Sequence, residues 1–343
     1  MREEYRKAVK LLKEGEIVAL PTETVYGLVG YFYSSSSLDK IFALKGRPEN
    51  KPLALFISSP EEMRSFSSHI HLSAWLLAYR FWPGPLTLVL SSKPGTGIPW
   101  VTVGFRIPQH PVPLKILSLL SPLWSTSANL TGKRSAVTYE EVKEYFAGKI
   151  PLILKDGREP LGKESTVVDV SGEEIKILRE GSLEVGEIKK ALNIRKVLFV
   201  CSGNTCRSLI AEKIFEKMSR GKFEVSSAGI HAYSASKIPY EVNRILQKEG
   251  IKDISHNPVP LTEELVKEKD LIFTMESFQR DWILEKWKEA KGKAFLLTSF
   301  TTGEDIKDPR GKGYSFYLKT LSKIKENLVK LIEELEDAYR FSQ

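Results

Sequence analysis

Cysteine is almost absent from this chain. The 343 residues contain two, Cys201 and Cys206, and both lie in the segment VLFVCSGNTCRSLIAE. A disulfide scaffold needs many cysteines in a short chain, and a structural zinc site needs four ligands, usually as spaced pairs. The nearest histidine in the sequence is His231. The sequence therefore excludes a disulfide framework, predicts no metal site and indicates a reducing compartment.

Long apolar runs are absent too. No segment of the sequence approaches the length of apolar chain that a membrane-spanning helix requires. The first residues, MREEYRKAVKLLKEG, form a charged amphipathic pattern that is typical of a helix and unlike a signal peptide. We therefore expect a cytoplasmic protein without a membrane partner.

A strong excess of one charge is the third absence. The net charge of +8 is divided evenly, because residues 1–192 hold 25 Lys and Arg against 21 Asp and Glu, and residues 193–343 hold 26 against 22. This balance suits small anionic substrates and does not predict stable nucleic-acid binding. The length and a change of composition near NIRKVLFV predict two domains, 1–192 and 195–343.

The second half alternates apolar runs with amphipathic segments. This alternation predicts a doubly wound parallel sheet of four strands. We expect strands at 196–200, 223–226, 270–274 and 294–297, and helices at 209–218, 240–248, 277–287 and 314–339.

The first half is interrupted more often by proline and glycine. Its short apolar runs predict a mixed sheet covered by helices, an α/β domain of another kind. We expect strands at 17–20, 53–57, 86–90, 101–107, 151–154 and 166–170, and a short closing helix over VGEIKKAL.

The loop CSGNTCR combines a thiol with features that bind anions. Gly203 permits a tight turn and Asn204 tolerates a left-handed backbone. Successive N–H groups that open a helix form an anion nest, to which Arg207 can add a bidentate fork. The same field favours the thiolate of Cys201, which Ser208 can stabilise by a hydrogen bond. The loop therefore suits attack by sulfur on phosphorus.

An acid for the leaving group is available in EDIKDPRG, where Asp308 precedes a proline. The same residues also fit an alternative interpretation. Two core cysteines can lie beside a surface arginine by chance, and Asp-Pro is a common turn.

Five motifs together resemble the low-molecular-weight protein tyrosine phosphatases. They are VCSGNTCRS, SSAGI, ISHNPVPLT, DLIFTM and DPRG, in the order and spacing of that family. The resemblance implies Cys201 as nucleophile, Arg207 as phosphate clamp and Asp308 as general acid. It implies a phosphate loop of Ser202, Gly203, Asn204, Thr205, Cys206 and Ser208, with Cys206 able to protect Cys201 as a reversible disulfide. No cofactor is expected for this domain.

Three departures from the family pattern concern the substrate. Leu209 stands where proline is usual, and Arg310 follows Asp-Pro where aromatic residues usually wall the phenol ring. Thr205 stands where tyrosine-specific members tend to have isoleucine, and it resembles the bacterial protein-arginine phosphatases. A hydroxyl suits a guanidinium better than a phenyl ring. The related arsenate reductases use further cysteines, which this chain lacks.

The first half gathers cations and hydroxyl groups. Three cations lie within one short Gly- and Pro-containing segment, which can hold a polyphosphate: Lys45, Arg47 and Lys51. A second cluster comprises Ser125, Thr126, Ser127 and Asn129, while Arg106 and His110 follow an apolar run. We find no nucleophile with an oriented base, so positioning and charge neutralisation are the expected mode. The alternative is a solvated basic loop followed by ordinary turns and caps.

The ordered motifs of this half resemble the YrdC family, the threonylcarbamoyl-AMP synthases. They are LPTETVYGL, FALKGRPENKPLALFI, FWPGPLTLVL, VGFRIPQHP, STSANLTG and ESTVVDV. The resemblance implies that L-threonine, bicarbonate and ATP, with Mg²⁺, give L-threonylcarbamoyladenylate and pyrophosphate. It assigns threonine to Thr22 and Ser165, the ATP phosphates to Lys45 and Arg47, and the nucleotide to Ser127, Asn129 and Arg179. Phe56 stands where some members have histidine.

Two functional hypotheses follow. The first is a bifunctional enzyme that makes the activated threonylcarbamoyl group for downstream tRNA-modifying proteins and dephosphorylates a phosphoprotein at arginine or tyrosine. The second is a regulatory module that binds nucleotide or RNA without turnover, fused to a phosphotyrosine-specific phosphatase. The low and evenly spread charge favours the first.

Overall fold

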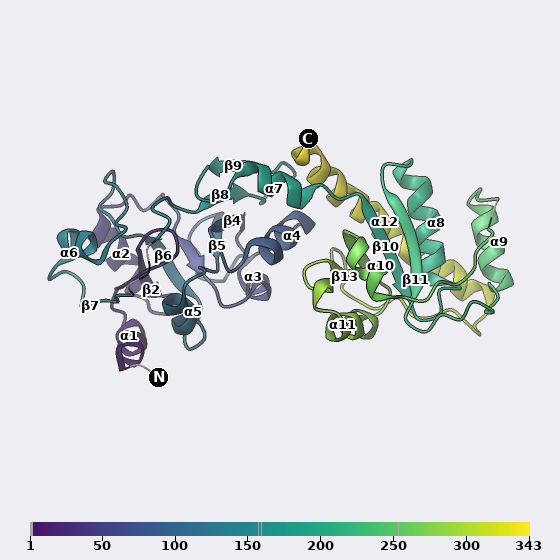
Figure 1. Ribbon diagram of the computed structural model, residues 1–343, viewed down its shortest axis with the longest axis horizontal. Coiled ribbons are helices and arrows are strands. Elements are labelled where there is room, and N and C mark those ends of the chain that lie inside the picture. Colours follow the sequence, from purple (N-terminus) through teal and green to yellow (C-terminus); the bar gives the residue numbers. More distant parts are fainter. Residues whose placement is uncertain (1–2, 157, 159, 253) are drawn as a thin grey trace. The chain divides into compact units, whose positions relative to one another are not determined.

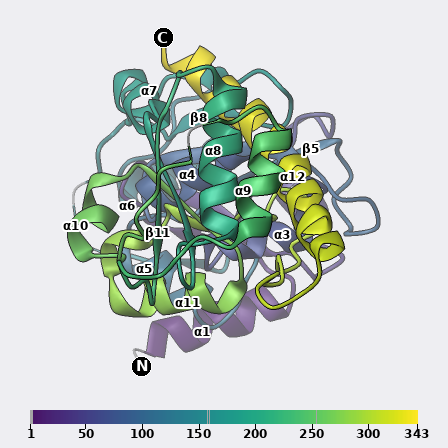
Figure 2. The same ribbon diagram turned by 90° about the vertical axis from the view of Figure 1, so that its right-hand side faces the viewer.

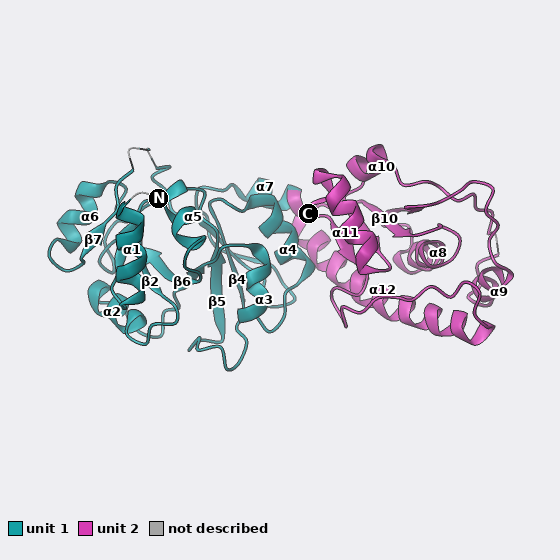
Figure 3. Ribbon diagram, turned by 90° about the horizontal axis from the view of Figure 1, so that it is seen from below, with its two compact units in different colours: residues 1–190 teal, residues 191–343 magenta. Residues whose placement is uncertain are grey.

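The computed structural model describes residues 3–156, 158, 160–252 and 254–343. The chain separates into two compact units, Met1–Lys190 and Ala191–Gln343, which are called unit 1 and unit 2 below (Figure 3). Each unit has its own sheet.

Unit 1 is built on a nine-stranded mixed sheet in the order β7-β1-β2-β6-β3-β5-β4-β8-β9 (Figure 1). The interior strand β6 pairs antiparallel with both of its neighbours, whereas β3 and β5 run parallel. The strands are β1 (Val18–Leu20), β2 (Gly27–Tyr31), β3 (Ala54–Phe56), β4 (Leu86–Ser91), β5 (Thr102–Arg106), β6 (Leu123–Ser127), β7 (Leu152–Ile153), β8 (Thr166–Asp169) and β9 (Lys176–Arg179).

The helices of unit 1 pack on this sheet. The first helix buries Ala8 and Leu12 against Val112 and Ile116 of the fifth helix and against the strand residue Val18. The helices are α1 (Glu3–Lys13), α2 (Ser37–Lys45), α3 (Met63–Phe66), α4 (Leu72–Phe81), α5 (Pro111–Leu117), α6 (Tyr139–Phe146) and α7 (Val185–Leu192), with a 3-10 turn at Pro60–Glu62.

The mixed sheet predicted for unit 1 is confirmed, but the sequence did not predict three of its strands. β2 contains two glycines in GLVGY, and in β6, LWSTS, two apolar residues are followed by three hydroxyl residues, so neither is a continuous apolar run. β9 is a largely exposed edge strand. The alternative interpretation assigned the serine and threonine cluster to turns and caps. In the structure, Ser125, Thr126 and Ser127 belong to the interior strand β6, where pairing with two neighbours holds them in place.

Unit 2 contains a four-stranded parallel sheet in the order β11-β10-β12-β13. The strands are β10 (Lys196–Cys201), β11 (Glu224–Gly229), β12 (Leu271–Thr274) and β13 (Ala294–Leu296). β10 lies between β11 and β12, so the order reverses beside it. Loops at such a switch point, at the carboxyl ends of the strands, are where doubly wound folds bind ligands.

Helices cover both faces of this sheet, and Figure 2 shows α8, α9 and α12 gathered apart from α10 and α11. Phe215 of α8 packs on Phe199 on one face, whereas Val266 of α10 and Ile283 of α11 pack with Leu198 on the other. The helices are α8 (Arg207–Ser219), α9 (Tyr240–Lys248), α10 (Glu263–Glu268), α11 (Ser277–Lys286) and α12 (Tyr314–Ser342), with a 3-10 turn at Lys288–Ala290. Among the described helices, none has both the length and the apolar character of a membrane span.

The parallel sheet predicted for unit 2 is confirmed, and all four predicted strands and helices exist there. Parallel strands are buried on both faces and therefore read as short apolar runs, which makes them easy to locate. The short helix α10, with one fully buried residue, was not predicted. β11 extends to Gly229 because its register with β10 continues to Cys201.

Candidate active sites

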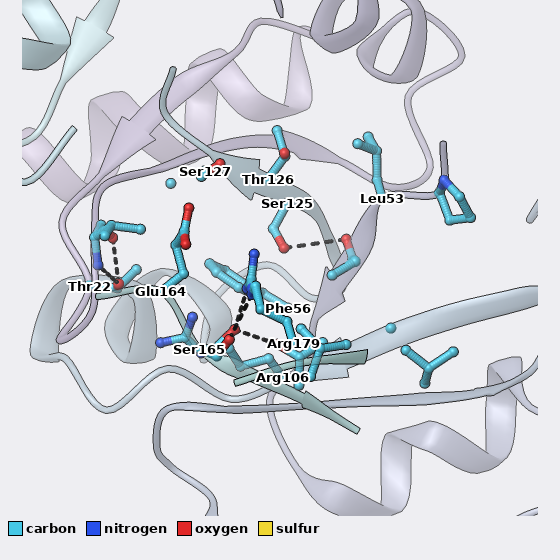
Figure 4. A pocket seen from close by; sticks show the side chains of 18 of the residues that line it. Thr22, Leu53, Phe56, Arg106, Ser125, Thr126, Ser127, Glu164, Ser165 and Arg179 are labelled. Carbon is cyan, nitrogen blue, oxygen red and sulfur yellow. Dashed lines mark hydrogen bonds between the residues drawn. The ribbon is translucent and has the colours of Figure 1, made fainter. Parts of the chain in front are cut away.

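A pocket of about 370 Å³ lies on one face of the unit 1 sheet (Figure 4). Its floor comes from alternate positions of neighbouring strands, such as Gly104 and Arg106 of β5, because side chains two apart point to the same face. It brings together eight of the predicted residues: Thr22, Arg47, Arg106, Ser125, Thr126, Ser127, Ser165 and Arg179. Lys45, Lys51 and Asn129 are not among its lining residues.

Arg106 is held rigidly at the end of β5. Its guanidinium donates to Glu23 Oε1 at 2.8 Å, to Thr24 Oγ1 at 2.9 Å and to the carbonyl of Gly84 at 3.2 Å. The residue is only 5% exposed, so the ion pair with Glu23 compensates a buried charge. These bonds fix the guanidinium at the pocket wall.

Ser165 and Arg179 form a second polar edge of the pocket, as Figure 4 shows. Arg179 donates to the Ser165 carbonyl at 3.0 Å and to its hydroxyl at 3.2 Å. The same hydroxyl lies 2.8 Å from Thr87 Oγ1 on β4. Nearby, a Cβ atom on Gly181 would lie 2.2 Å from the Glu164 carbonyl oxygen, so this close approach requires glycine.

The three cations of the basic segment do not converge. Lys45 ends α2, is 3% exposed, and donates from Nζ to the carbonyls of Ser127 and Asn129 (2.7 Å for Asn129) and to Asn129 Oδ1 at 3.0 Å. Burial, followed by the nearby charge of Arg47, lowers the pKa of Lys45 to about 7. Arg47 lines the pocket, while Lys51 is exposed and contributes its carbonyl to Arg47. The alternative of a solvated basic loop is therefore wrong for Lys45, whereas its assignment to the ATP phosphates stays a prediction.

Asn129 supports the site from outside the lining. Its Oδ1 accepts from the Ser127 hydroxyl at 2.6 Å, and its amide donates to the carbonyls of Leu130 and Lys133. His110, also singled out by the sequence, is a buried cap of α5 whose Nδ1 accepts from Val112 N. Neither residue lines the pocket. Asn129 contacts the lining residue Ser127, whereas His110 caps α5.

The sequence reasoning missed two carboxylates here. Glu23 lies in the TET of a quoted motif and pairs with Arg106, and Glu164 immediately precedes Ser165 and lines the pocket. The sequence did contain a signal for these carboxylates, because each is an acidic residue inside a quoted motif whose hydroxyl residues alone were considered. For ATP phosphates the lining offers Arg47 and Arg179, and for a divalent cation it offers the single carboxylate of Glu164.

The second site is the loop that follows β10 in unit 2. Asn204 has φ 52°, which confirms the predicted left-handed backbone. A Cβ atom on Gly229 would lie 2.7 Å from the Ser202 carbonyl oxygen and 2.8 Å from Asn204 N, so β11 must have glycine there. The loop thus folds tightly against the neighbouring strand.

Cys201 ends β10 and is 3% exposed. Its Sγ lies 3.0 Å from Ser208 Oγ, as predicted for a hydroxyl that stabilises a thiolate. Asn204 Nδ2 donates to that same hydroxyl oxygen at 3.0 Å and to Ser227 Oγ at 2.8 Å. The Ser208 hydroxyl therefore has its own proton free to donate toward the sulfur.

Arg207 begins α8 and is 1% exposed. Its Nη1 donates to the Ile306 carbonyl at 2.8 Å and pairs with Glu276, and its Nη2 pairs with Asp308 Oδ2 at 2.6 Å. Its Nε is buried and has no hydrogen-bond partner among the described residues. A buried donor without a partner is unusual and is available to an anion.

Cys206 is a different kind of thiol. It is 4% exposed, lies 3.7 Å from Thr205 Oγ1, and burial raises its pKa to about 11. Both cysteines are free thiols. Cys206 is thus kept neutral at physiological pH.

Asp308 lies between β13 and α12, as the sequence predicted. Its side chain is 45% exposed, and its Oδ1 accepts from Arg310 N at 2.9 Å. The carboxylate therefore reaches Arg207 on one side and solvent on the other. Arg310 is exposed.

Supports of this loop were also missed, because they come from distant segments. Gln279 Nε2 donates to Ser202 Oγ and to Glu276 Oε2, both at 3.1 Å, and His256 Nε2 lies 2.8 Å from the Asn204 carbonyl oxygen. His256 stands in a quoted motif, ISHNPVPLT, so that motif was the available signal.

Two family models match the chain. The Sua5/YciO/YrdC model, described as Telomere recombination, matches residues 10–181, and the low molecular weight phosphotyrosine protein phosphatase model matches residues 196–340.

Individual proteins resemble one unit or both. A threonylcarbamoyl-AMP synthase of Pyrococcus abyssi is 40% identical over 194 residues, which cover 54% of this chain and 56% of that protein, so the chain spans about half of this relative. The structure of P. abyssi Sua5 complexed with L-threonine is 25% identical, with a TM-score of 0.52, over 98% of this chain and 94% of that one. YwlE arginine phosphatase from Geobacillus stearothermophilus is 33% identical over 41% of this chain and 93% of that one, with a TM-score of 0.40.

Proposed function

Through residues 10–181 the chain belongs to the Sua5/YciO/YrdC family, its residues 196–340 form a low-molecular-weight phosphatase domain, and on that premise we propose a bifunctional cytoplasmic enzyme. Unit 1 converts L-threonine, bicarbonate and ATP into L-threonylcarbamoyladenylate and pyrophosphate, for tRNA modification by downstream proteins. Unit 2 hydrolyses a phosphorylated protein side chain. The two free thiols suit a reducing compartment.

The pocket of unit 1 carries the first half of this proposal. It places Arg47 and Arg179, neither of which has an acidic partner among the described residues, in the same lining as the hydroxyl groups of Thr22 and Ser165. Guanidinium groups suit phosphates and carboxylates, and hydroxyl groups suit the polar parts of an amino acid and a ribose. The similar P. abyssi Sua5 was crystallised with L-threonine, which supports threonine as one substrate here.

Catalysis in unit 1 rests on positioning. Arg47 and Arg179 would hold the phosphates of ATP, which enters with Mg²⁺, while Thr22 and Ser165 orient threonine. Lys45 would act by fixing the carbonyls of Ser127 and Asn129, because its ammonium already bonds to them. Threonine and bicarbonate would give the N-carboxylated amino acid with loss of water. Neutralising charge on ATP would then favour attack of a carbamate oxygen on the α-phosphorus, with pyrophosphate leaving.

Mass spectrometry of the product tests this activity. The purified protein should form threonylcarbamoyladenylate and release pyrophosphate when threonine, bicarbonate and ATP are all present. Omitting any one should abolish both products. Binding of ATP without pyrophosphate release in the full mixture would favour the regulatory module instead.

The loop 201–208 carries the second half. The thiolate of Cys201 would attack phosphorus, the N–H groups of the loop and Arg207 would bind the phosphate oxygens, and Asp308 would protonate the leaving group. Water would then hydrolyse the cysteinyl-phosphate. The unpartnered Nε of Arg207 supports an anion at this position, since it is a buried donor. Hydrolysis of p-nitrophenyl phosphate, with mass-spectrometric trapping of a phosphorylated Cys201, tests the mechanism.

We assign phosphoarginine as the preferred substrate of unit 2. Thr205 offers a hydroxyl, and the exposed Arg310 stands where an aromatic wall would be expected, so a desolvated guanidinium finds polar partners and a phenyl ring finds little packing. Rates on phosphoarginine and phosphotyrosine peptides of one sequence test this preference.

A further inference from the structure

One acidic side chain lines the pocket of unit 1, against three arginines. Among the described lining residues, Glu164 is the single carboxylate, and Arg47, Arg106 and Arg179 are the cations. Arg106 is already balanced by Glu23 at 2.8 Å. The pocket thus presents two arginines without an acidic partner and one separate carboxylate.

One oxygen of the Glu164 carboxylate is held by a hydrogen bond, and the other can accept one from a ligand. Its Oε1 accepts from Ser135 Oγ at 2.6 Å, and Ser135 is 7% exposed, so this partner is itself fixed. Its Oε2 accepts no hydrogen bond from any residue that the structure describes. The Glu164 carbonyl accepts from Ser182 N at 2.9 Å, which holds the backbone as well. Figure 4 shows the carboxylate extending into the pocket between Thr22 and the serines of β6.

A structural role as the counter-ion of Lys45 does not account for Glu164. Burial, followed by the charge of Arg47, lowers the pKa of Lys45, and the charge of Glu164 raises it by less. The Lys45 ammonium nevertheless bonds to Ser127 O, Asn129 O and Asn129 Oδ1, and among the described residues Lys45 and Glu164 form no ion pair. An acid exposed to a pocket that is otherwise built for anions would repel its own ligands. It therefore suits a cationic group among its ligands, either an ammonium group or the Mg²⁺ that accompanies ATP, which is left out of the calorimetry below.

The substrates supply one such partner. This step rests on the proposed function of unit 1, in which ATP, bicarbonate and the carboxylate of threonine are anions. The α-ammonium of threonine is the one cationic group among the organic substrates, and its N–H groups suit a carboxylate oxygen. We propose that Glu164 binds the α-ammonium of the amino-acid substrate, through Oε2, and so selects amino acids over hydroxy acids of the same shape.

Calorimetry with two ligands and two proteins tests this assignment. The ligands are L-threonine and its 2,3-dihydroxybutyrate analogue, in which a hydroxyl replaces the ammonium, and the full-length proteins are the wild type and Glu164→Gln. We expect the wild type to prefer threonine by about tenfold or more, the usual effect of a charge-assisted hydrogen bond. The variant should lose most of that preference. A general disturbance of the pocket lowers both affinities and cancels in their ratio.

Two further variants sharpen the test. Glu164→Asp keeps the charge and should keep part of the preference, whereas Glu180→Gln removes an exposed carboxylate that does not line the pocket and should change nothing. An unchanged ratio in Glu164→Gln, or a wild type without preference, overturns the assignment. A wild type that prefers threonine but makes no threonylcarbamoyladenylate contradicts the proposed activity of unit 1 and leaves the assignment of Glu164 standing.

Discussion

The two candidate sites draw on the chain in opposite ways. In unit 2 the nucleophile, the anion-binding loop and the arginine follow one strand without interruption, between Cys201 and Ser208. In unit 1 the pocket takes its side chains from β3, β4, β5, β6, β8 and β9 and from the loop at Thr22. One site is made by local turn geometry, and the other exists only when a mixed sheet has found its register.

The arginines differ in the same way. Arg207 uses three of its five N–H groups on Glu276, Asp308 and a carbonyl, and its buried Nε has no partner among the described residues. In the part of the chain that the structure describes, Arg47 and Arg179 bond only to carbonyls and a hydroxyl. A phosphate in unit 2 therefore meets an arginine that is already paired with two carboxylates, whereas in unit 1 it meets arginines that have no acidic partner in that same described part of the chain. This contrast suggests how the two activities can be separated.

The largest separation should come from the nucleophile. Cys201→Ser should abolish hydrolysis of p-nitrophenyl phosphate, because a serine hydroxyl is not ionised in the same anion nest. Formation of threonylcarbamoyladenylate should continue at the wild-type rate, since the pocket of unit 1 contains no residue of unit 2. Phosphatase activity at the wild-type rate in this variant would remove the nucleophile assignment.

At pH 7 the thiolate fraction of Cys206 should be about a hundredfold smaller than that of an ordinary thiol. Its pKa is raised from 9.0 to about 11, so at pH 7 it has about a hundredfold less thiolate. In Cys201→Ser, alkylation of Cys206 by iodoacetamide should be slow at pH 7 and should rise about tenfold per pH unit toward pH 10. Peptide mass mapping measures it. Rapid alkylation at neutral pH would show that Cys206 is not kept protonated.

Removing a pocket arginine that has no acidic partner among the described residues should lower the activity of unit 1 by about tenfold or more. Arg47→Ala should lower kcat/KM for ATP by at least about tenfold, because a hydrogen bond to a charged partner contributes about 1.5–3 kcal/mol. Lys51→Ala is the matched control, since it removes an exposed cation of the same segment outside the pocket lining. Equal, unchanged kinetics in both variants would mean that the segment is only a solvated surface.

The smallest change, a few-fold shift in substrate preference, is expected from replacing Thr205 in the loop that follows β10. Thr205→Ile should shift the ratio of rates on phosphoarginine and phosphotyrosine peptides toward phosphotyrosine, because an apolar wall penalises unpaired guanidinium N–H groups. A conservative Thr205→Ser change should leave the ratio near the wild-type value. A wild type that prefers phosphotyrosine, with no response to isoleucine, would contradict the substrate assignment while leaving the thiolate chemistry intact.

The contrast between the units also explains what the sequence could predict. The left-handed Asn204, the position of Asp308 and all four parallel strands were correctly predicted, since each depends on short-range turn chemistry or on a buried apolar run. β6 was missed because three of its five residues are polar and its partners, β2 and β3, are far away in the sequence. The burial of Lys45 was not predicted, because nothing local shows that Ser127 and Asn129 enclose its ammonium.

The carboxamide of Asn204 has a consequence for motion. It links four parts of unit 2 at once, because Nδ2 bonds to Ser208 and Ser227 while Oδ1 accepts from Val259 N at 2.8 Å. The Val259 amide can exchange with solvent deuterium only when that bond opens, which requires the loop to move. An anion that locks the loop should therefore slow exchange at Val259, fifty-five positions along the chain from Asn204. The Asn204 side chain thus makes the backbone N–H of Val259 a reporter of anion binding beside Cys201.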